Sequence, residues 1–313
     1  MADYVFGVDI GGTTVKIGLF TVDGNLTEKW EITTRVDEGG KYILNDIAES
    51  LENKMKERNI SKENVAGIGM GVPGPVKEDG TVLRCANLGW GIFNVSDELG
   101  SIIGLPVKVG NDANMAALGE MWQGGGKGYS NIVMVTLGTG VGGGIILNGK
   151  MLSGVNGAGG EIGHIQVNDT ETEVCGCGRK GCLEQYTSAT GIVRMANIAL
   201  NNTDRPSSLR TVQYVSAKEV FDAAKNGDDL AIELVENHGK CLGKALAMIA
   251  CVVDPEVFVI GGGVSRAGSI ITDTTAKYFQ EYCFHACKKT QFTLATLGND
   301  AGIYGGACSV LNA

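Results

Sequence analysis

The chain contains the same short pattern twice, and this repeat constrains its fold more than any other feature. Residues 4–26 form an apolar, β-branched run, a turn of glycine and threonine, a second apolar run and an Asp-Gly turn. Residues 132–152 repeat this order and include an Asn-Gly turn. Both stretches predict strand, turn, strand and a further hairpin. Two such halves predict a duplicated fold with a ligand cleft between them.

The first turn has the sequence Asp9-Ile10-Gly11-Gly12-Thr13-Thr14. Backbone N–H groups in such a turn bind phosphate oxygens, and the threonine hydroxyls add further donors. Asp9, at the strand end, could hold Mg²⁺ through water. A plain glycine hairpin explains the same residues, and Lys16 is either a phosphate partner or a solvated strand residue.

The second turn, residues 138–143, matches the dinucleotide-binding pattern G-x-G-x-x-G. A dinucleotide site needs a helix directly after the loop. Apolar residues 145–147 and a hairpin turn follow instead, and they predict a strand. The pattern G-x-x-x-x-G-K-[ST] is also absent from the sequence. We therefore interpret this turn as a second phosphate loop, neither a nicotinamide site nor a P-loop.

Composition narrows the class of protein. A length of 313 residues allows two ordinary domains, and a net charge of −9 argues against nucleic acid or an anionic membrane as partner. The longest apolar run, residues 245–253, is too short to span a bilayer, and we expect no secretory leader. Nine cysteines, an odd number, fit a reducing compartment. We expect a cytoplasmic protein.

Apolar spacing predicts the remaining elements. Residues 43–58 carry apolar side chains at an i, i+4 spacing, which predicts an amphipathic helix. Residues 124–128 are a glycine-rich break and a candidate hinge. We predict buried strands over residues 65–70, 105–109 and 257–260, and helices over residues 113–122, 188–200, 220–225, 229–253 and 301–311.

Asp112 lies at the corner between a predicted strand and a predicted helix. A carboxylate at a helix start is favoured by unsatisfied N–H groups and the helix dipole, so Asp112 is explained as a cap. A lone Asp that points from a strand end into a cleft is also how a kinase presents a base to an attacking hydroxyl. The residues alone leave both interpretations open.

Residues 161–184 combine one histidine, three cysteines and two flanking acids. Thiolate and imidazole suit tetrahedral zinc, and four such ligands close a structural site. A disulfide or unlinked thiols are the alternative, although Cys175 and Cys177 are too close in sequence to pair comfortably. A closed site would fix Glu161 and Glu184, and two rigid carboxylates suit a polyol ligand. The predicted zinc ligands are His164, Cys175, Cys177 and Cys182.

Other candidates are weaker. Asn87 and Trp90 are either ligand contacts or a turn residue and a core indole. His238 and His285 have no patterned partners and are expected in packing or at the surface. Gly261, Gly262 and Gly263 follow a predicted buried strand, where bare backbone lets the sugar or base of a nucleotide lie close.

Together these residues make the chain similar to the ROK family of sugar kinases along essentially its whole length, and within it to the bacterial members that phosphorylate glucose with ATP. The Cys-rich motif with its upstream GEIGH is the most diagnostic. The matching motifs are DIGGTT (9–14), GVPGPV (71–76), NLGW (87–90), NDAN (111–114), LGTGVGGG (137–144), GGEIGH (159–164), CGCGRKGCLE (175–184) and GGGVS (261–265).

The resemblance implies an α/β, actin-like and hexokinase-type (ribonuclease H-like) duplicated two-domain fold with a central cleft. It implies a small α/β domain of residues 1–112 plus a C-terminal helix at about 300–313, and a large α/β domain of residues 113–299 with the zinc-binding loop. A family branch of repressors carries an N-terminal helix-turn-helix, which we do not expect ahead of Tyr4. We expect a homo-oligomer, either a dimer or a tetramer.

The resemblance also implies roles and cofactors: ATP, Mg²⁺ and a structural Zn²⁺. Asp112 would be the catalytic base, and sugar hydroxyls would be bound by Asn111, Glu161, His164 and Glu184. His164 would share its two ring nitrogens between zinc and sugar. Phosphates would be held by Asp9, Gly11, Gly12, Thr13, Thr14, Lys16, Gly138, Thr139 and Gly140, and adenosine by Gly261, Gly262 and Gly263.

The expected reaction is phosphorylation of glucose at its 6-hydroxyl by MgATP. The first alternative is the same chemistry on N-acetylmannosamine, mannose or fructose. The second is a sugar sensor without catalysis on the same fold, against which Asp112 and both phosphate loops count.

Overall fold

A computed structural model describes residues 2–312. The chain forms two compact units. The first consists of the residues up to 128, residues 144–160 and those from 297 onward, and the second of residues 129–143 and 161–296. The chain therefore passes between the units at four points. The domain boundaries expected from the sequence stay a prediction.

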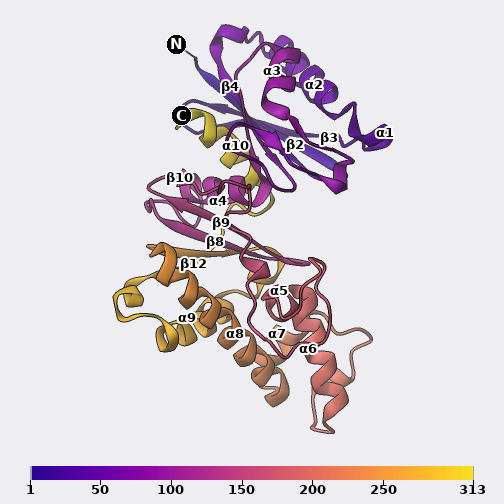
Figure 1. Ribbon diagram of the computed structural model, residues 1–313, viewed down its shortest axis with the longest axis vertical. Coiled ribbons are helices and arrows are strands. Elements are labelled where there is room, and N and C mark those ends of the chain that lie inside the picture. The colour runs from indigo at the N-terminus through magenta and orange to yellow at the C-terminus, as the bar shows by residue number, and fades with distance from the viewer. Residues whose placement is uncertain (1, 313) are drawn as a thin grey trace. The chain divides into compact units, whose positions relative to one another are not determined.

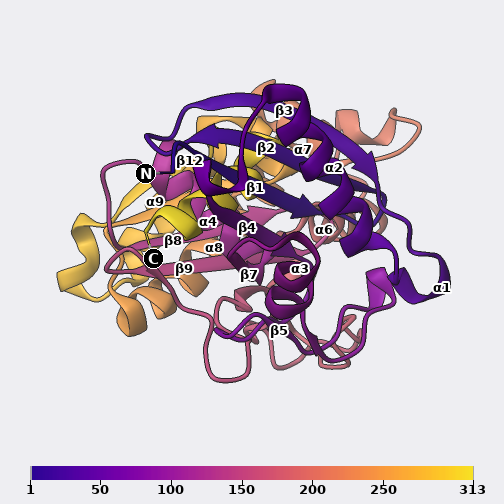
Figure 2. The same cartoon turned by 90° about the horizontal axis from the view of Figure 1, so that it is seen from above.

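The first unit contains a five-stranded sheet with the order β3-β2-β1-β4-β7 (Figures 1 and 2). Strands β1, β4 and β7 are parallel, and β1, β2 and β3 are joined as antiparallel hairpins. The elements of this unit are β1 (Tyr4–Ile10), β2 (Thr14–Thr21), β3 (Leu26–Thr33), α1 (Asp37–Gly40), α2 (Ile43–Arg58), β4 (Val65–Val72), β5 (Thr81–Val82), β6 (Phe93–Asn94), α3 (Val95–Ile103), β7 (Val107–Asn111), α4 (Asp112–Gln123), β10 (Lys150–Met151) and α10 (Ala301–Leu311).

Alternate residues of β1 enter two different cores. Phe6 and Val8 pack with the buried faces of α2 and α3, whereas Val5 packs with Ile303 of α10. Successive side chains of a strand point to opposite faces, so helices cover both sides of this sheet. The predicted return of the C-terminal helix to the first half is confirmed, and Asp9 shares the α10 side with Val5.

The second sheet has the order β10-β9-β8-β11-β12, in which a hairpin and parallel strands follow the same plan. The predicted duplication is therefore confirmed. The remaining elements are β8 (Ile132–Leu137), β9 (Val141–Leu147), α5 (Glu184–Thr187), α6 (Ala189–Asn202), α7 (Ala217–Lys225), α8 (Asp229–Val253), β11 (Val257–Gly261), α9 (Ser269–Tyr282) and β12 (Gln291–Leu294).

Most predicted elements are present, with one shift. The helices over residues 43–58 and 301–311 have the predicted bounds, and β9 follows the second glycine loop, which removes the dinucleotide-binding interpretation. The strand predicted over residues 105–109 instead spans Val107–Asn111. Pro106 lacks the N–H that a ladder needs, so regular pairing begins only after it. Among residues 2–312, no helix combines the length and apolar character that crossing a lipid bilayer requires.

Candidate active site and metal centre

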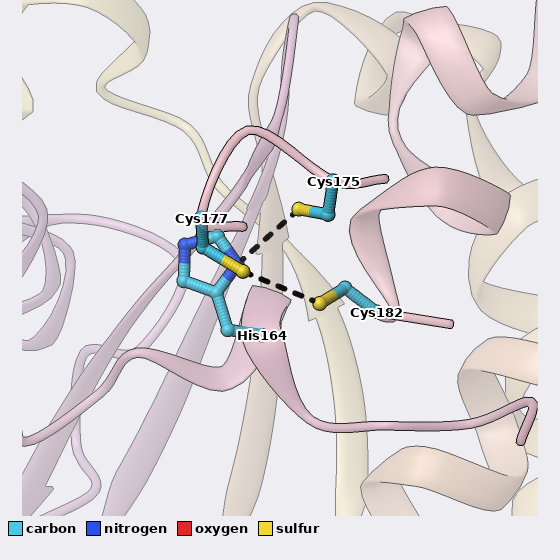
Figure 3. Close-up of side chains that lie close together, drawn as sticks. All are labelled: His164, Cys175, Cys177 and Cys182. Carbon is cyan, nitrogen blue, oxygen red and sulfur yellow. Dashed lines mark hydrogen bonds between the residues drawn. The ribbon is translucent and has the colours of Figure 1, made fainter. Parts of the chain in front are cut away.

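The four predicted metal ligands lie together in the second unit (Figure 3). Their ligand atoms are all within 4.8 Å of one another. Sγ of Cys177 is 3.6 Å from Sγ of Cys182, and Sγ of Cys175 is 3.8 Å from Nδ1 of His164. Bonds of about 2.1–2.3 Å to a tetrahedral zinc ion place neighbouring ligand atoms roughly 3.5–3.8 Å apart. The cluster therefore fits zinc.

The disulfide alternative does not describe this cluster. The nine cysteines, all within the described residues, are unlinked. The separation of 3.6 Å between Cys177 and Cys182 is far longer than a disulfide bond of about 2.05 Å.

A tight hairpin places two of the thiols on one side of the cluster. The N–H of Cys175 donates to the carbonyl of Arg179 at 2.7 Å, and Gly178 donates to the carbonyl of Cys175 at 2.8 Å. A hydrogen bond from the backbone N–H of Arg179 lowers the pKa of Cys177 to about 6, whereas burial raises the pKa of Cys175 to about 12. A divalent cation bound at the cluster would stabilise the other cysteines as thiolates, because metal binding favours their deprotonated form.

The same loop is also anchored without any metal. Arg194 of α6 donates to the carboxylates of Glu171 and Glu173, at 2.5 and 2.7 Å. The hydroxyl of Tyr186 also donates to Glu171, and this bond is the main reason that the pKa of Glu171 is lowered to about 2. Glu171 is thus a charged and paired carboxylate that fixes the loop on α6.

Both predicted sugar-binding acids lie beside the cluster. Oε1 of Glu184 is 2.9 Å from Sγ of Cys175 and 3.7 Å from Nδ1 of His164. Oε2 of Glu161 is 4.0 Å from Nε2 of His164, and its side chain is 51% exposed. The two nitrogens of His164 therefore face different groups: Nδ1 faces the cluster and Nε2 faces Glu161.

The second glycine loop lies against Glu184. The N–H of Gly138 donates to the carbonyl of Gly140 at 3.0 Å, and the N–H of Val141 donates to Oε2 of Glu184 at 3.4 Å. A Cβ atom on Gly140 would stand 2.7 Å from Oε2 of Glu184, so a larger residue there would displace that carboxylate. The structure thus brings the loop and a cluster-side acid together.

The third glycine stretch lies beside the same strand end. Gly261 pairs with Thr136 of β8, and a Cβ atom on Gly262 would stand 2.5 Å from the carbonyl oxygen of Leu137. The residues expected to contact adenosine therefore lie next to the strand that leads into the Gly138–Gly140 loop.

In the first unit, Asp9 and Asp112 lie on either side of Gly71. A Cβ atom on Gly71 would stand 3.5 Å from both Oδ1 of Asp9 and Cα of Asp112. Burial raises the pKa of Asp9 to about 6, the charge of Lys16 opposes this shift, and the charge of Asp112 adds to it. Gly302 of α10 gives the carboxylate room, because a Cβ atom there would stand 2.6 Å from Cγ of Asp9.

The N-cap residue of α4 is Asn111, and Asp112 is the first residue of the helix. Oδ1 of Asn111 accepts from the N–H groups of Ala113 and Asn114, at 3.0 and 3.1 Å. Nδ2 of Asn111 donates to the carbonyl of Gly74 at 3.1 Å. Oδ1 of Asp112 also accepts from the N–H of Ala113, at 2.8 Å, so both side chains serve the start of the helix.

The first glycine turn is fixed by a residue that the sequence did not single out. Gly11 donates to the carbonyl of Thr14 at 2.9 Å. The hydroxyl of Thr34 donates to the carbonyl of Gly11 at 2.8 Å, and its N–H donates to the carbonyl of Thr13 at 3.0 Å. Thr34 is distant in sequence and carries no motif. Nζ of Lys16 donates to the carbonyl of Asn299 at 3.0 Å.

The weaker candidates separate clearly. Trp90 is buried and donates through Nε1 to the carbonyl of Gly40 at 3.0 Å, whereas Asn87 is exposed. His238 is buried with Nε2 3.1 Å from the carbonyl oxygen of Thr187, and the exposed His285 packs against Phe284. The predicted packing and surface positions of the two histidines are confirmed.

Comparison with known proteins places the chain in a family. The ROK family model matches residues 5–313, and the chain belongs to the ROK family. It is 44% identical over 307 residues to a glucokinase of Halalkalibacterium halodurans, which covers 96% of this chain and 92% of that protein. An N-acetylgalactosamine kinase of a Shewanella species is 31% identical over 314 residues, which cover 96% and 95% of the two chains.

Solved structures agree with this membership. The ROK family glucokinase of Streptomyces griseus, crystallised with glucose and AMPPNP, matches with a TM-score of 0.73 and 33% identity. The match covers 97% of this chain and 98% of that chain. The predicted actin-like, duplicated two-domain α/β fold is thereby confirmed.

Proposed function

We propose that this protein transfers the γ-phosphoryl group of MgATP to the 6-hydroxyl of glucose. The observation that carries this proposal is the full-length similarity of the chain to glucokinases, together with the position of Asp112 at the start of α4 beside Gly71.

In this reaction Asp112 accepts the proton of the 6-hydroxyl as the sugar oxygen attacks the γ-phosphorus. The bond between that phosphorus and the oxygen bridging to the β-phosphate breaks, and ADP leaves with the bridging oxygen. Asp9 would hold Mg²⁺ through water, and the ion would offset charge on the phosphates. Backbone N–H groups of the turns at Gly11–Thr14 and Gly138–Gly140, with Lys16, would bind phosphate oxygens, and the Gly261–Gly263 stretch would contact adenosine.

The sugar would be held by residues around the metal cluster and by Asn111. Glu161 and Glu184 offer carboxylate acceptors, and His164 offers Nε2 while Nδ1 faces the cluster. Zinc in a closed site of four ligands has no position for a reactive water, so its role would be structural. Homo-oligomeric assembly and a cytoplasmic location also stay predictions.

A second substrate class follows from the N-acetylgalactosamine kinase among the relatives. N-acetylated hexoses therefore belong beside mannose and fructose in any test of specificity. A sugar sensor on the same fold would bind sugar and form no ADP.

The test is a coupled assay of ADP formation with MgATP and a panel of hexoses and N-acetylhexosamines. The proposal expects the highest kcat/KM with glucose, and NMR of the product should place the phosphate on the 6-oxygen. A higher kcat/KM with another sugar would reassign the substrate. Glucose binding by calorimetry without ADP formation would instead indicate the sensor.

A further inference from the structure

Ala189 and Thr190 donate hydrogen bonds to two consecutive carbonyl groups of the second glycine loop. The N–H of Ala189 donates to the carbonyl of Gly138 at 2.8 Å, and the hydroxyl of Thr190 donates to the carbonyl of Thr139 at 2.7 Å. In a trans peptide the N–H points opposite to the carbonyl of the same plane. These two bonds therefore turn the N–H groups of Thr139 and Gly140 toward the other side of the loop.

The same short segment is continuous with the metal centre. Cys182 is followed by α5, and the N–H of Cys182 donates to Oε1 of Gln185 at 3.0 Å. The hydroxyl of Ser188 then donates to the carbonyl of Glu184 at 2.6 Å. A cluster ligand is thus connected to the glycine loop through one turn of helix and the Ser188–Thr190 segment.

A second connection runs through the side chain of Glu184. One of its carboxylate oxygens contacts Sγ of Cys175 at 2.9 Å, and the other accepts from the N–H of Val141 at 3.4 Å. Val141 directly follows Gly140. The loop is therefore held on one side by Thr190 and on the other by an acid that touches the cluster.

We propose that the Ser188–Thr190 segment couples metal occupancy to nucleotide binding, with Thr190 as a positioning residue for the Gly138–Gly140 loop. The inference rests on the proposed function, because it takes this loop as a phosphate site and the cluster as a zinc site. A filled cluster would fix Cys182 and Glu184, and the loop would then lose less conformational freedom when it binds phosphate.

Thr190 allows a clean test, because its side chain is exposed and its replacement leaves the core intact. Thr190→Val removes the donor and keeps the shape, and Thr190→Ser is the matched control that keeps the hydroxyl. Calorimetry would measure the Kd of Mg-AMPPNP and, separately, of glucose for the zinc-loaded proteins. We expect Thr190→Val to weaken nucleotide binding about five- to tenfold, the scale of one hydrogen bond, with glucose affinity within about twofold. Thr190→Ser should match the wild type.

The coupling between metal occupancy and nucleotide binding is measured through the retention of zinc. Linkage requires that if zinc favours nucleotide binding, nucleotide must favour zinc retention by the same factor. Capture of zinc by a colorimetric chelator should therefore be about fivefold weaker with saturating Mg-AMPPNP in the wild type and in Thr190→Ser. In Thr190→Val the nucleotide should protect zinc clearly less than in the wild type, because only the Ala189 bond and the contact through Glu184 remain.

Equal protection of zinc by nucleotide in Thr190→Val and the wild type would overturn the coupling, as would an unchanged nucleotide Kd in Thr190→Val. A different result would refute the proposed function. A protein that binds Mg-AMPPNP and zinc as described and forms no ADP with any sugar would refute the kinase and leave the coupling standing.

Discussion

Asp9 of β1 and Asp112, which begins α4 directly after β7, both lie close to Gly71 of β4, the strand between β1 and β7. Asp9 pairs with Gly71 in the parallel register, and Gly71 pairs with Gly110 of β7, two residues before Asp112. The negative charge of Asp112 contributes to the raised pKa of Asp9. The residue proposed to hold Mg²⁺ and the residue proposed to take the proton are therefore coupled in their ionisation.

This coupling predicts a shifted pH dependence. The pKa of Asp9 is raised to about 6, mainly by burial and further by the charge of Asp112. Below that pH, protons therefore compete with Mg²⁺ for the Asp9 carboxylate. The Kd of Mg-AMPPNP should rise up to about tenfold per pH unit below pH 6. In Asp112→Asn the rise should begin at lower pH, because one negative charge is removed. Titration of both proteins by calorimetry checks this, and identical midpoints would count against the coupling.

The metal cluster predicts one zinc ion per chain in protein purified without chelator, measured by elemental analysis. Cys182→Ser should lose most of the metal and raise the KM for glucose about tenfold or more, because Glu184 and His164 are then held less firmly. Cys251→Ser, which changes an exposed cysteine of α8 outside the cluster, is the control and should keep both. Zinc-free wild-type protein with an ordinary KM would refute the structural role.

The sequence predicted much of this site because the relevant signals are local. The spacing of His164 and the three cysteines identified the cluster, and the i, i+4 stripe identified α2 to its last residue. Glycine loops were visible as composition, and their strand context excluded a dinucleotide site.

Relationships between distant residues were out of reach. Thr34 donates a hydrogen bond to the first glycine turn, and Thr190 donates one to the second. Neither threonine belongs to a motif that the sequence reveals. The N-cap of α4 lies at Asn111, one residue before Asp112, and Asp112 also accepts from the N–H of Ala113. Such offsets depend on where β7 starts, and that depends on its pairing with β4.

Because His238 is buried, we expect the folded protein to lose stability in mild acid. Burial is the main cause that lowers its pKa from 6.5 to about 4, so between these values the unfolded chain binds more protons than the folded protein. This contribution to stability is present above pH 6.5 and is lost as the pH falls toward 4, by about 3 kcal/mol. Urea unfolding at several pH values should show a smaller decline in His238→Gln. His285→Gln, at an exposed site, should decline like the wild type.

We expect Glu120 to have a structural role, although it belongs to no sequence motif. Its side chain is fully buried in α4, and its carboxylate accepts from the N–H groups of Leu297 and Gly125, at 2.8 and 2.7 Å. Glu120→Gln replaces one acceptor with a donor that faces an N–H group, so the free energy of unfolding should fall by about 2–4 kcal/mol. Chemical denaturation checks this against Glu281→Gln, an exposed change that should stay within about 0.5 kcal/mol. Equal stabilities would show that Glu120 is dispensable.

The most direct test of the central claim compares the wild type with Asp112→Asn in the coupled ADP assay with glucose and MgATP. The substitution keeps the size of the side chain and removes the base. We expect kcat to fall about a hundredfold or more, while the Kd for glucose, measured by calorimetry, changes less than about twofold. Near-normal turnover in Asp112→Asn would contradict the account.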